Sequence, residues 1–230
     1  MIKAKGVSLR YPDGTLALKG IDLEIDTGEL VYITGPSGSG KTSLLKLLMG
    51  IEYPTSGSLK VMGQSIAKGQ EGNIRRLRKR IGPVFQEFRL IQGRTALENV
   101  MMGMRFLGIP CRQAKENAKS ALTRLGLEHK ALSMVENLSW GEAQRVAIAR
   151  AVARKPRLIM ADEPTGNLDH DNALIILDLL TSFRDTNTTV IITTHATHLI
   201  ERQENATFIR MNGGNISVER RGKAYEEYLV

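Results

Sequence analysis

The sequence is poor in residues that mark several protein classes. It has one cysteine, Cys111, among 230 residues, so no disulfide can form within the chain, and we expect a reducing compartment such as the cytosol. It has no apolar run near the roughly 20 residues that span a bilayer, and residues 1–5 lack the pattern of a signal peptide. If the protein works at a membrane, we expect another subunit to hold it there.

Long runs of one charge are also absent, although positive charge is in excess. The formal net charge is +8, which favours anionic partners such as nucleotides, nucleic acids or a membrane surface. The densest basic stretch, residues 75–80, is short and is interrupted by Leu77. Most of the charge therefore indicates a solvated surface, and we expect no nucleic-acid partner.

Hydrophobic patterning predicts an α/β fold. With 42% hydrophobic residues, the chain can form one domain, or one domain with an added lobe. Alternating apolar and acidic residues at 21–26 predict a strand with one solvated face, and turns such as residues 11–14 break the segment 2–34 into short strands. Continuous apolar runs predict buried strands, and helical spacing predicts the helices between them. The predicted buried strands are 30–34, 158–161 and 189–193, and the predicted helices are 42–49, 141–154 and 169–185.

The segment 95–135 differs from the rest, because its apolar residues recur at helical spacing over a long stretch. It predicts an inserted helical lobe. The charged tail, residues 219–230, predicts a short helix or a frayed end.

A glycine-rich stretch follows the predicted strand 30–34 and precedes the predicted helix 42–49. Its glycines let the backbone curl so that N–H groups point at phosphate oxygens, and the helix adds its positive end. Lys41 can reach the β- and γ-phosphates, and the Thr42 hydroxyl can ligate Mg²⁺. The stretch is Gly35, Pro36, Ser37, Gly38, Ser39, Gly40, Lys41 and Thr42, which matches the P-loop pattern in the context that confirms it.

Two adjacent carboxylates end the predicted strand 158–161. Phosphoryl transfer needs a metal-organising acid and a group that handles the attacking water. The carboxyl ends of strands are where ligands bind in open α/β sheets. We therefore expect Asp162 to hold Mg²⁺, directly or through water, and Glu163 to polarise the water.

With these motifs, essentially the whole chain resembles the ATP-binding cassette (ABC) ATPases. The resemblance implies that Tyr11 stacks on adenine, that Ser43 joins the P-loop in binding ATP, and that Gln86 senses Mg²⁺. His195 resembles the family's γ-phosphate switch histidine, so Glu163, His195 and Gln86 are the implied catalytic set. The implied metal ligands are Thr42, Gln86 and Asp162, with ATP and Mg²⁺ as cofactors.

The resemblance also implies a homodimer that forms on ATP. Residues 138–142 occupy the place of the family's Leu-Ser-Gly-Gly-Gln motif, which covers the γ-phosphate of a partner's site, and Asp169 matches the loop that crosses the interface. The residues that would contact ATP in trans are Ser139, Trp140, Gly141 and Glu142. This chain departs from the pattern in two places, since Trp140 replaces a glycine and Ala196 stands where many relatives carry an acid.

The family's architecture gives the fold class as α/β. It implies a P-loop NTPase core, with a mainly parallel sheet flanked by helices, an antiparallel β subdomain and an inserted α-helical subdomain. We expect one domain over residues 1–230, with the core and β subdomain at about 1–86 and 156–220 and the helical subdomain at about 87–155.

Within the family, the segments 44–54, 85–91, 94–100 and 194–200 look most like the bacterial cell-division cassettes of the FtsE group. That group implies an integral membrane partner, FtsX, a location on the inner face of the cell membrane, and ATP cycles that activate cell-wall hydrolases. The partner's helix would dock near residues 86–90 and 101–104, where methionines can adapt to irregular apolar surfaces or belong to the lobe's core.

Three alternatives stay open. The run 161–169 is shared with the lipoprotein-release cassette LolD and the macrolide-export cassette MacB. The net charge of +8 leaves a nucleic-acid-linked cassette ATPase as a second alternative. The third alternative is a nucleotide-dependent regulator with slow turnover, because an indole at position 140 is a large change where backbone approaches phosphate.

Overall fold

The computed structural model describes residues 1–222. Its strands are β1 (Ile2–Arg10), β2 (Leu16–Ile25), β3 (Leu30–Thr34), β4 (Ser56–Val61), β5 (Gln64–Ser65), β6 (Ile81–Val84), β7 (Leu158–Asp162), β8 (Thr189–Thr194), β9 (Ala206–Asn212) and β10 (Asn215–Arg221). Its α-helices are α1 (Lys41–Leu48), α2 (Glu71–Arg78), α3 (Ala96–Arg105), α4 (Cys111–Arg124), α5 (Trp140–Val152) and α6 (His170–Thr181). Short 3₁₀ helices are η1 (Glu128–Lys130), η2 (Val135–Asn137) and η3 (Thr197–Leu199).

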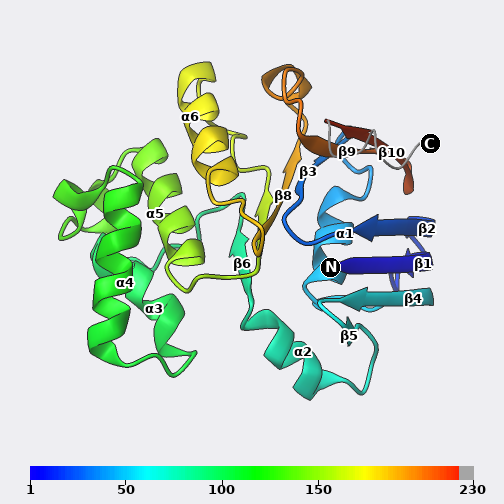
Figure 1. Ribbon diagram of the computed structural model, residues 1–230, viewed down its shortest axis with the longest axis horizontal. Helices are drawn as coiled ribbons and strands as arrows, with labels where there is room; N and C mark the ends of the chain where they lie inside the picture. The colour runs from blue at the N-terminus through cyan, green and yellow to red at the C-terminus, as the bar shows by residue number, and fades with distance from the viewer. Residues whose placement is uncertain (223–230) are drawn as a thin grey trace.

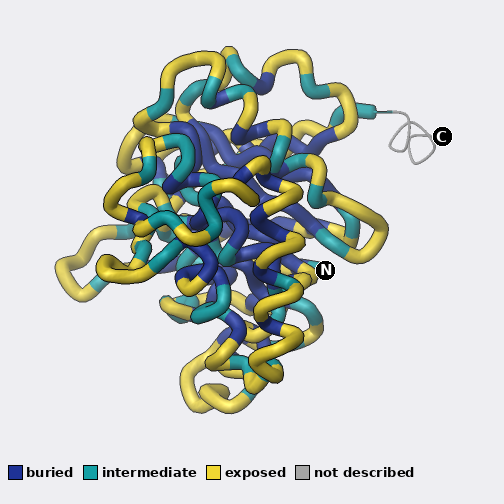
Figure 2. Tube along the Cα trace, turned by 90° about the vertical axis from the view of Figure 1, so that its left-hand side faces the viewer, coloured by how far each residue is buried: buried dark blue, intermediate teal, exposed yellow. Residues whose placement is uncertain are grey.

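A six-stranded sheet with the order β10-β9-β3-β8-β7-β6 forms the centre of the molecule. Strands β9, β3, β8, β7 and β6 are parallel, and β10 pairs antiparallel at one edge. The continuous apolar runs of β3 and β8 are buried along their whole length, as their sequences predict. Figure 2 shows this buried centre beneath an exposed outer layer.

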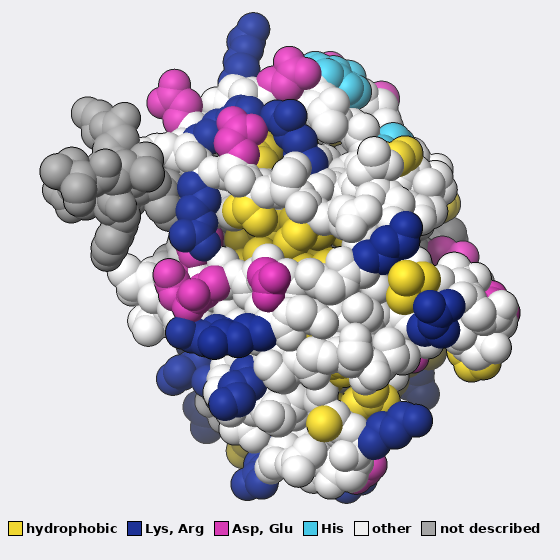
Figure 3. All heavy atoms as spheres, turned by 90° about the vertical axis from the view of Figure 1, so that its right-hand side faces the viewer, with side chains coloured by type: hydrophobic (Ala, Val, Ile, Leu, Met, Phe, Trp, Pro, Cys, Tyr) yellow, Lys and Arg dark blue, Asp and Glu magenta, His cyan; other side chains and the backbone are white. Residues whose placement is uncertain are grey.

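A second, antiparallel sheet with the order β2-β1-β4-β5 lies beside α1 (Figure 1). In β2, Ile21, Leu23 and Ile25 are buried while the acidic residues between them are exposed. This alternation is the expected pattern of a sheet with one solvated face. The outer surface of this side of the molecule carries Lys and Arg side chains with Asp and Glu among them (Figure 3).

Helices α3, α4 and α5 pack together as a lobe on the other side of the central sheet (Figure 1). Apolar residues from all three helices are fully buried and continuous with the core under the sheet, among them Val100, Met104, Leu122 and Val146. Met104 therefore belongs to the core, while Met101 and Met102 are partly exposed. The fold is the α/β architecture that the sequence predicts.

One strand was not predicted from the sequence, and one predicted segment differs in the structure. Strand β6 contains Gly82 and Pro83, which argue against a central strand, and β6 pairs only with β7 at the edge of the sheet, where proline is tolerated. The predicted helix or frayed end at 219–230 is wrong for residues 219–221, which pair with β9 as the end of β10. Residues 223–230 lie outside the described part of the chain.

A capping box fixes the start of α3 and generates the first prediction. The Thr95 hydroxyl accepts a hydrogen bond from the N–H of Glu98 at 3.2 Å, and the Glu98 carboxylate accepts one from the N–H of Thr95 at 2.9 Å. Thr95→Ala should lower the free energy of unfolding by about 1 kcal/mol. Thr95→Ser keeps the hydroxyl and is the matched control. Equal stabilities of the two variants in urea denaturation would contradict the role of the cap.

Candidate active site

A groove of about 720 Å³ opens where β3, β7 and β8 end. Its size is in the range of small-molecule sites. Most of the residues that the sequence predicts for nucleotide binding and catalysis line it together. The lining residues are Tyr11, Thr15, Leu16, Ala17, Lys19, Ser37, Gly38, Gly40, Lys41, Thr42, Ser43, Gln86, Glu163, His195, Gly213 and Gly214.

Two glycines of the loop between β3 and α1 combine a positive φ with neighbouring backbone too close for a side chain. Gly35 has φ 147°, and a Cβ there would lie 2.3 Å from the carbonyl oxygen of Met211. Gly40 has φ 107°, and a Cβ there would lie 2.6 Å from the carbonyl oxygen of Ala17. Both glycines therefore allow the loop to pack against neighbouring backbone while it turns into α1.

Lys41 is buried at the start of α1 and its ammonium lies inside the loop. It donates hydrogen bonds to the carbonyl oxygens of Gly35 at 2.8 Å and Pro36 at 3.2 Å. It also lies 3.3 Å from a carboxylate oxygen of Glu163. Because Lys41 is 7% exposed and has these partners, its ammonium group is fixed in one position inside the loop.

Asp162 ends β7 within reach of the loop. Its carboxylate accepts hydrogen bonds from the Thr42 hydroxyl at 3.1 Å and from the Thr193 hydroxyl at 2.8 Å. Thr193 lies on the neighbouring strand β8, opposite Asp162 in the parallel register. Two hydroxyls from different elements thus orient one carboxylate beside the loop.

Glu163 lies one residue further, between Lys41 and His195. Its second carboxylate oxygen lies 2.7 Å from Nδ1 of His195 and accepts the His195 backbone N–H at 3.2 Å. Its own N–H donates to the Thr193 hydroxyl at 2.9 Å. Glu163 has φ 46°, a left-handed backbone that costs a residue with a side chain on the order of 1–2 kcal/mol. The surroundings hold this carboxylate in a conformation that the chain alone disfavours.

The groove fits a polyphosphate with a divalent cation. The N-terminus of α1, which favours anions, carries Lys41 and Thr42 at the groove. No cluster of three or more His, Cys, Asp or Glu suited to a metal occurs among residues 1–222. The pair of Thr42 and Asp162 instead suits Mg²⁺, which binds few protein ligands and completes its shell with phosphate and water.

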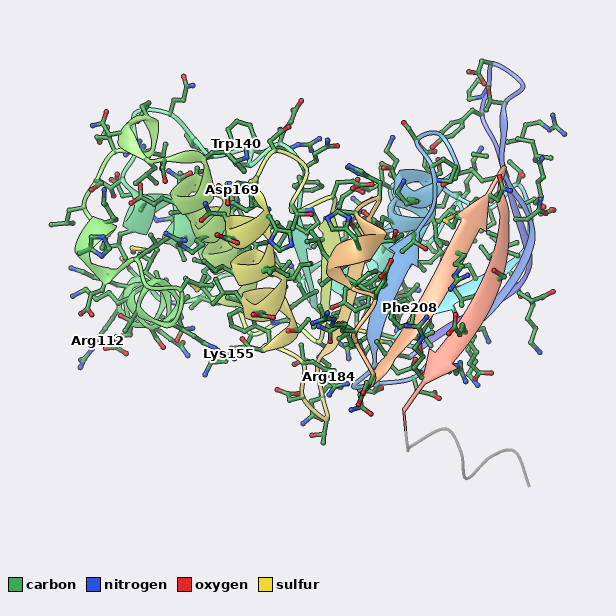
Figure 4. The ribbon with its side chains drawn as sticks, turned by 90° about the horizontal axis from the view of Figure 1, so that it is seen from above. Arg112, Trp140, Lys155, Asp169, Arg184 and Phe208 are labelled. Carbon is green, nitrogen blue, oxygen red and sulfur yellow. The ribbon has the colours of Figure 1, made fainter. Side chains whose placement is uncertain are left out.

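The residues expected to act in trans lie apart from this groove. Ser139 and Asp169 begin α5 and α6 as N-caps, and none of Ser139, Trp140, Gly141, Glu142 or Asp169 lines the groove of the same chain. Figure 4 shows Trp140 and Asp169 on one side of the molecule, opposite Lys155 and Arg184. The start of α5 is therefore presented outward on the side where α6 also begins.

Glu142 and Asp169 are both carboxylates that cap helices. The N–H of Ser139, followed by the Lys130 ammonium at 3.2 Å, lowers the pKa of Glu142 below its ordinary value. The N–H and side chain of Asn172 lower the pKa of Asp169. Both groups therefore stabilise the folded state above their unfolded pKa values, and this contribution is lost as pH falls through the folded values.

The sequence did not predict Thr193, or the part of the groove lined by Lys19 and Gly214. From the sequence, Thr193 is one more β-branched residue of a buried strand. Only the register of β8 with β7 brings its hydroxyl to the Asp162 carboxylate and to the backbone N–H of Glu163. Lys19 lies on β2 and Gly214 in the turn between β9 and β10, and the N–H of Lys19 donates a hydrogen bond to the carbonyl of Gly214. No local pattern in the sequence signals this meeting.

Comparisons with known proteins place this geometry in a family. The family model "ABC transporter" matches residues 18–166. The cell division ATP-binding protein FtsE of Streptococcus pneumoniae is 35% identical over 97% of this chain and 97% of its own length. FtsE of Mycobacterium tuberculosis is 39% identical over 96% of this chain and 97% of its own length.

Two solved structures agree with this assignment. A dimeric structure of the ATP-binding cassette MJ0796, bound to ADP and Pi, has a TM-score of 0.85 and 34% identity, and covers 96% of this chain and 100% of that chain. The structure of cbiO1 from Clostridium perfringens, part of an ABC transporter complex, has a TM-score of 0.87 and 31% identity, and covers 99% and 92%. The groove at the sheet edge and these likenesses together show that this chain belongs to the ABC transporter family, as an ATP-binding subunit that hydrolyses ATP.

Proposed function

We propose that this chain is an FtsE-type ATPase that partners an FtsX-like integral membrane protein and couples ATP hydrolysis to the activation of cell-wall hydrolases in cell division. The similarity to FtsE proteins of different bacteria over nearly their whole lengths supports this proposal. Within residues 1–222, none of the helices is long and apolar enough to cross a bilayer. The partner would then hold the chain at the inner face of the cell membrane.

The proposed ATP site follows from the groove. Tyr11 lies at its wall with its hydroxyl 3.1 Å from Oγ of Ser43, where its ring can face the adenine. The loop from Gly35 to Thr42 and the Lys41 ammonium would bind the phosphates. Mg²⁺, held by Thr42, Asp162 and Gln86, would neutralise phosphate charge and orient the γ-phosphate.

The observation that carries the proposed mechanism is the position of Glu163. Its carboxylate lies at the end of β7, within 3.3 Å of Lys41 and 2.7 Å of His195. A γ-phosphate bound by Lys41 would bring its in-line water beside this carboxylate, which can accept the water's proton. His195 would hold Glu163 and the γ-phosphate in position from the other side.

The first test is Glu163→Gln, which keeps the shape of the side chain and removes its basicity. We expect ATP binding to persist while turnover falls by at least about 100-fold, the lower range for loss of a general base. Glu116→Gln, on the exposed surface of α4, is the matched control and should leave turnover unchanged. Turnover of the Glu163→Gln chain at the level of the unaltered chain would contradict the assignment.

A second test addresses whether each site takes the start of α5 from another chain. Lys41→Ala should abolish nucleotide binding in its own groove. Ser139→Asp keeps a good N-cap for α5 and adds a negative charge that repels the γ-phosphate of a partner. Each variant alone should be inactive.

Mixing the two variants should restore activity, because a mixed pair contains one site with an intact Lys41 and an intact Ser139. If both residues act within one chain, no mixture can contain an intact site. ATPase activity measured over a range of mixing ratios distinguishes the two arrangements, and activity that stays absent at every ratio would exclude the trans site.

The third test concerns the membrane partner. An affinity tag on the chain, with mild detergent extraction of native membranes, should recover one integral membrane protein in a fixed ratio. That protein should raise the ATPase rate of the purified chain when both are reconstituted. Recovery of the chain without any membrane protein, under conditions that keep its ATPase activity, would contradict the proposed coupling.

A further inference from the structure

Phe88 is held by α5 through both its side chain and its backbone. The ring of Phe88 meets the indole of Trp140 edge to face, with centroids 4.5 Å apart at 62°. The Arg150 guanidinium donates hydrogen bonds to the carbonyl oxygens of Phe88 and Arg89, each at 2.6 Å. The loop after β6 is thus attached to α5 at the first residue of the helix and again three turns along.

The other end of the same loop is fixed to α3. The Asn99 side chain accepts the N–H of Ile91 at 2.7 Å and donates to the Ile91 carbonyl at 3.1 Å. Asn99 is fully buried, so this contact holds the loop firmly. Gln86, which lines the nucleotide groove, lies two residues before Phe88 on this loop. A shift of Phe88 would therefore change the position of Gln86.

Trp140 lies at the start of α5 and also contacts the loop that carries Phe88. It is the first residue of α5, directly after the N-cap Ser139, and the residue is 48% exposed. Figure 4 places it on the same side of the molecule as Asp169. The indole is turned onto Phe88, so the large side chain at this position does not have to fill the space in front of the helix N-terminus.

We propose that Trp140 is a positioning residue that couples the start of α5 to the loop carrying Gln86. When Ser139 of this chain closes over the ATP bound to a second chain, the Trp140–Phe88 contact transmits the position of α5 to Gln86 in this chain's own groove. The inference rests on the proposed function, because it requires the two-chain ATPase cycle. In this proposal Trp140 couples the two ATP sites of the pair to each other and does not contact the reacting atoms.

The test compares Trp140→Ala, Phe88→Leu and the double variant by steady-state ATPase kinetics. Each single change should lower kcat by about threefold to tenfold, the range expected for an aromatic pair, with little change in the Kd for ATP. The double variant should be no slower than the slower single variant, because both changes remove the same contact. Trp140→Phe keeps an aromatic ring and should restore most of kcat.

Phe106→Leu is the matched control for Phe88→Leu. Phe106 is 81% exposed after α3, and its replacement should leave kcat unchanged. Thermal melting of all variants checks that they fold. Independent effects that multiply in the double variant, or full activity of Phe88→Leu, would overturn the coupling. Absence of turnover in the unaltered chain would instead contradict the proposed function itself.

Trp140 is the only tryptophan in the chain, so its fluorescence reports the contact without hydrolysis. Phe88→Leu should shift the emission to longer wavelength, because the smaller side chain leaves more of the indole exposed to water, while Phe106→Leu should not. In the Glu163→Gln chain, saturating Mg-ATP should shift the emission to shorter wavelength as the exposed half is covered. An emission spectrum that responds to neither change would overturn the proposed position of Trp140.

Discussion

The parallel register of β3, β8 and β7 is the constraint on which the site depends. Thr34 lies opposite Thr194, and Asp162 lies opposite Thr193, so the three strands end at one level. The residues that follow each strand therefore emerge together. Hydrogen bonds between the strands fix their register. This register brings together the loop to Lys41, the acids at the end of β7 and His195 after β8, without any long-range attraction between these groups.

Much of this arrangement could be predicted from the sequence, because it depends on long apolar runs and on glycines with a defined purpose. The runs of β3, β7 and β8 are buried on both faces and have a strong local signal. The glycines at 35 and 40 are required by backbone packing at single positions. Each feature of this kind is specified within a few residues, so reasoning from a single sequence can find it.

The features that could not be predicted depend on contacts between distant segments. The short strand β6 contradicts local propensity and exists only because it pairs with β7 at an edge. The turn of the Trp140 indole onto Phe88 depends on the packing of α5 against the loop after β6. Because the indole is turned onto Phe88, the capping box that Ser139 and Glu142 form is present beside it.

The left-handed backbone of Glu163 has a consequence for the evolution of this chain. A glycine at this position would adopt φ 46° without the steric cost. The chain instead keeps a carboxylate there, with Thr193, Lys41 and His195 arranged to hold it. The backbone of this residue is therefore strained where its carboxylate is needed, and relief of that strain by glycine would remove the group that the groove is built around.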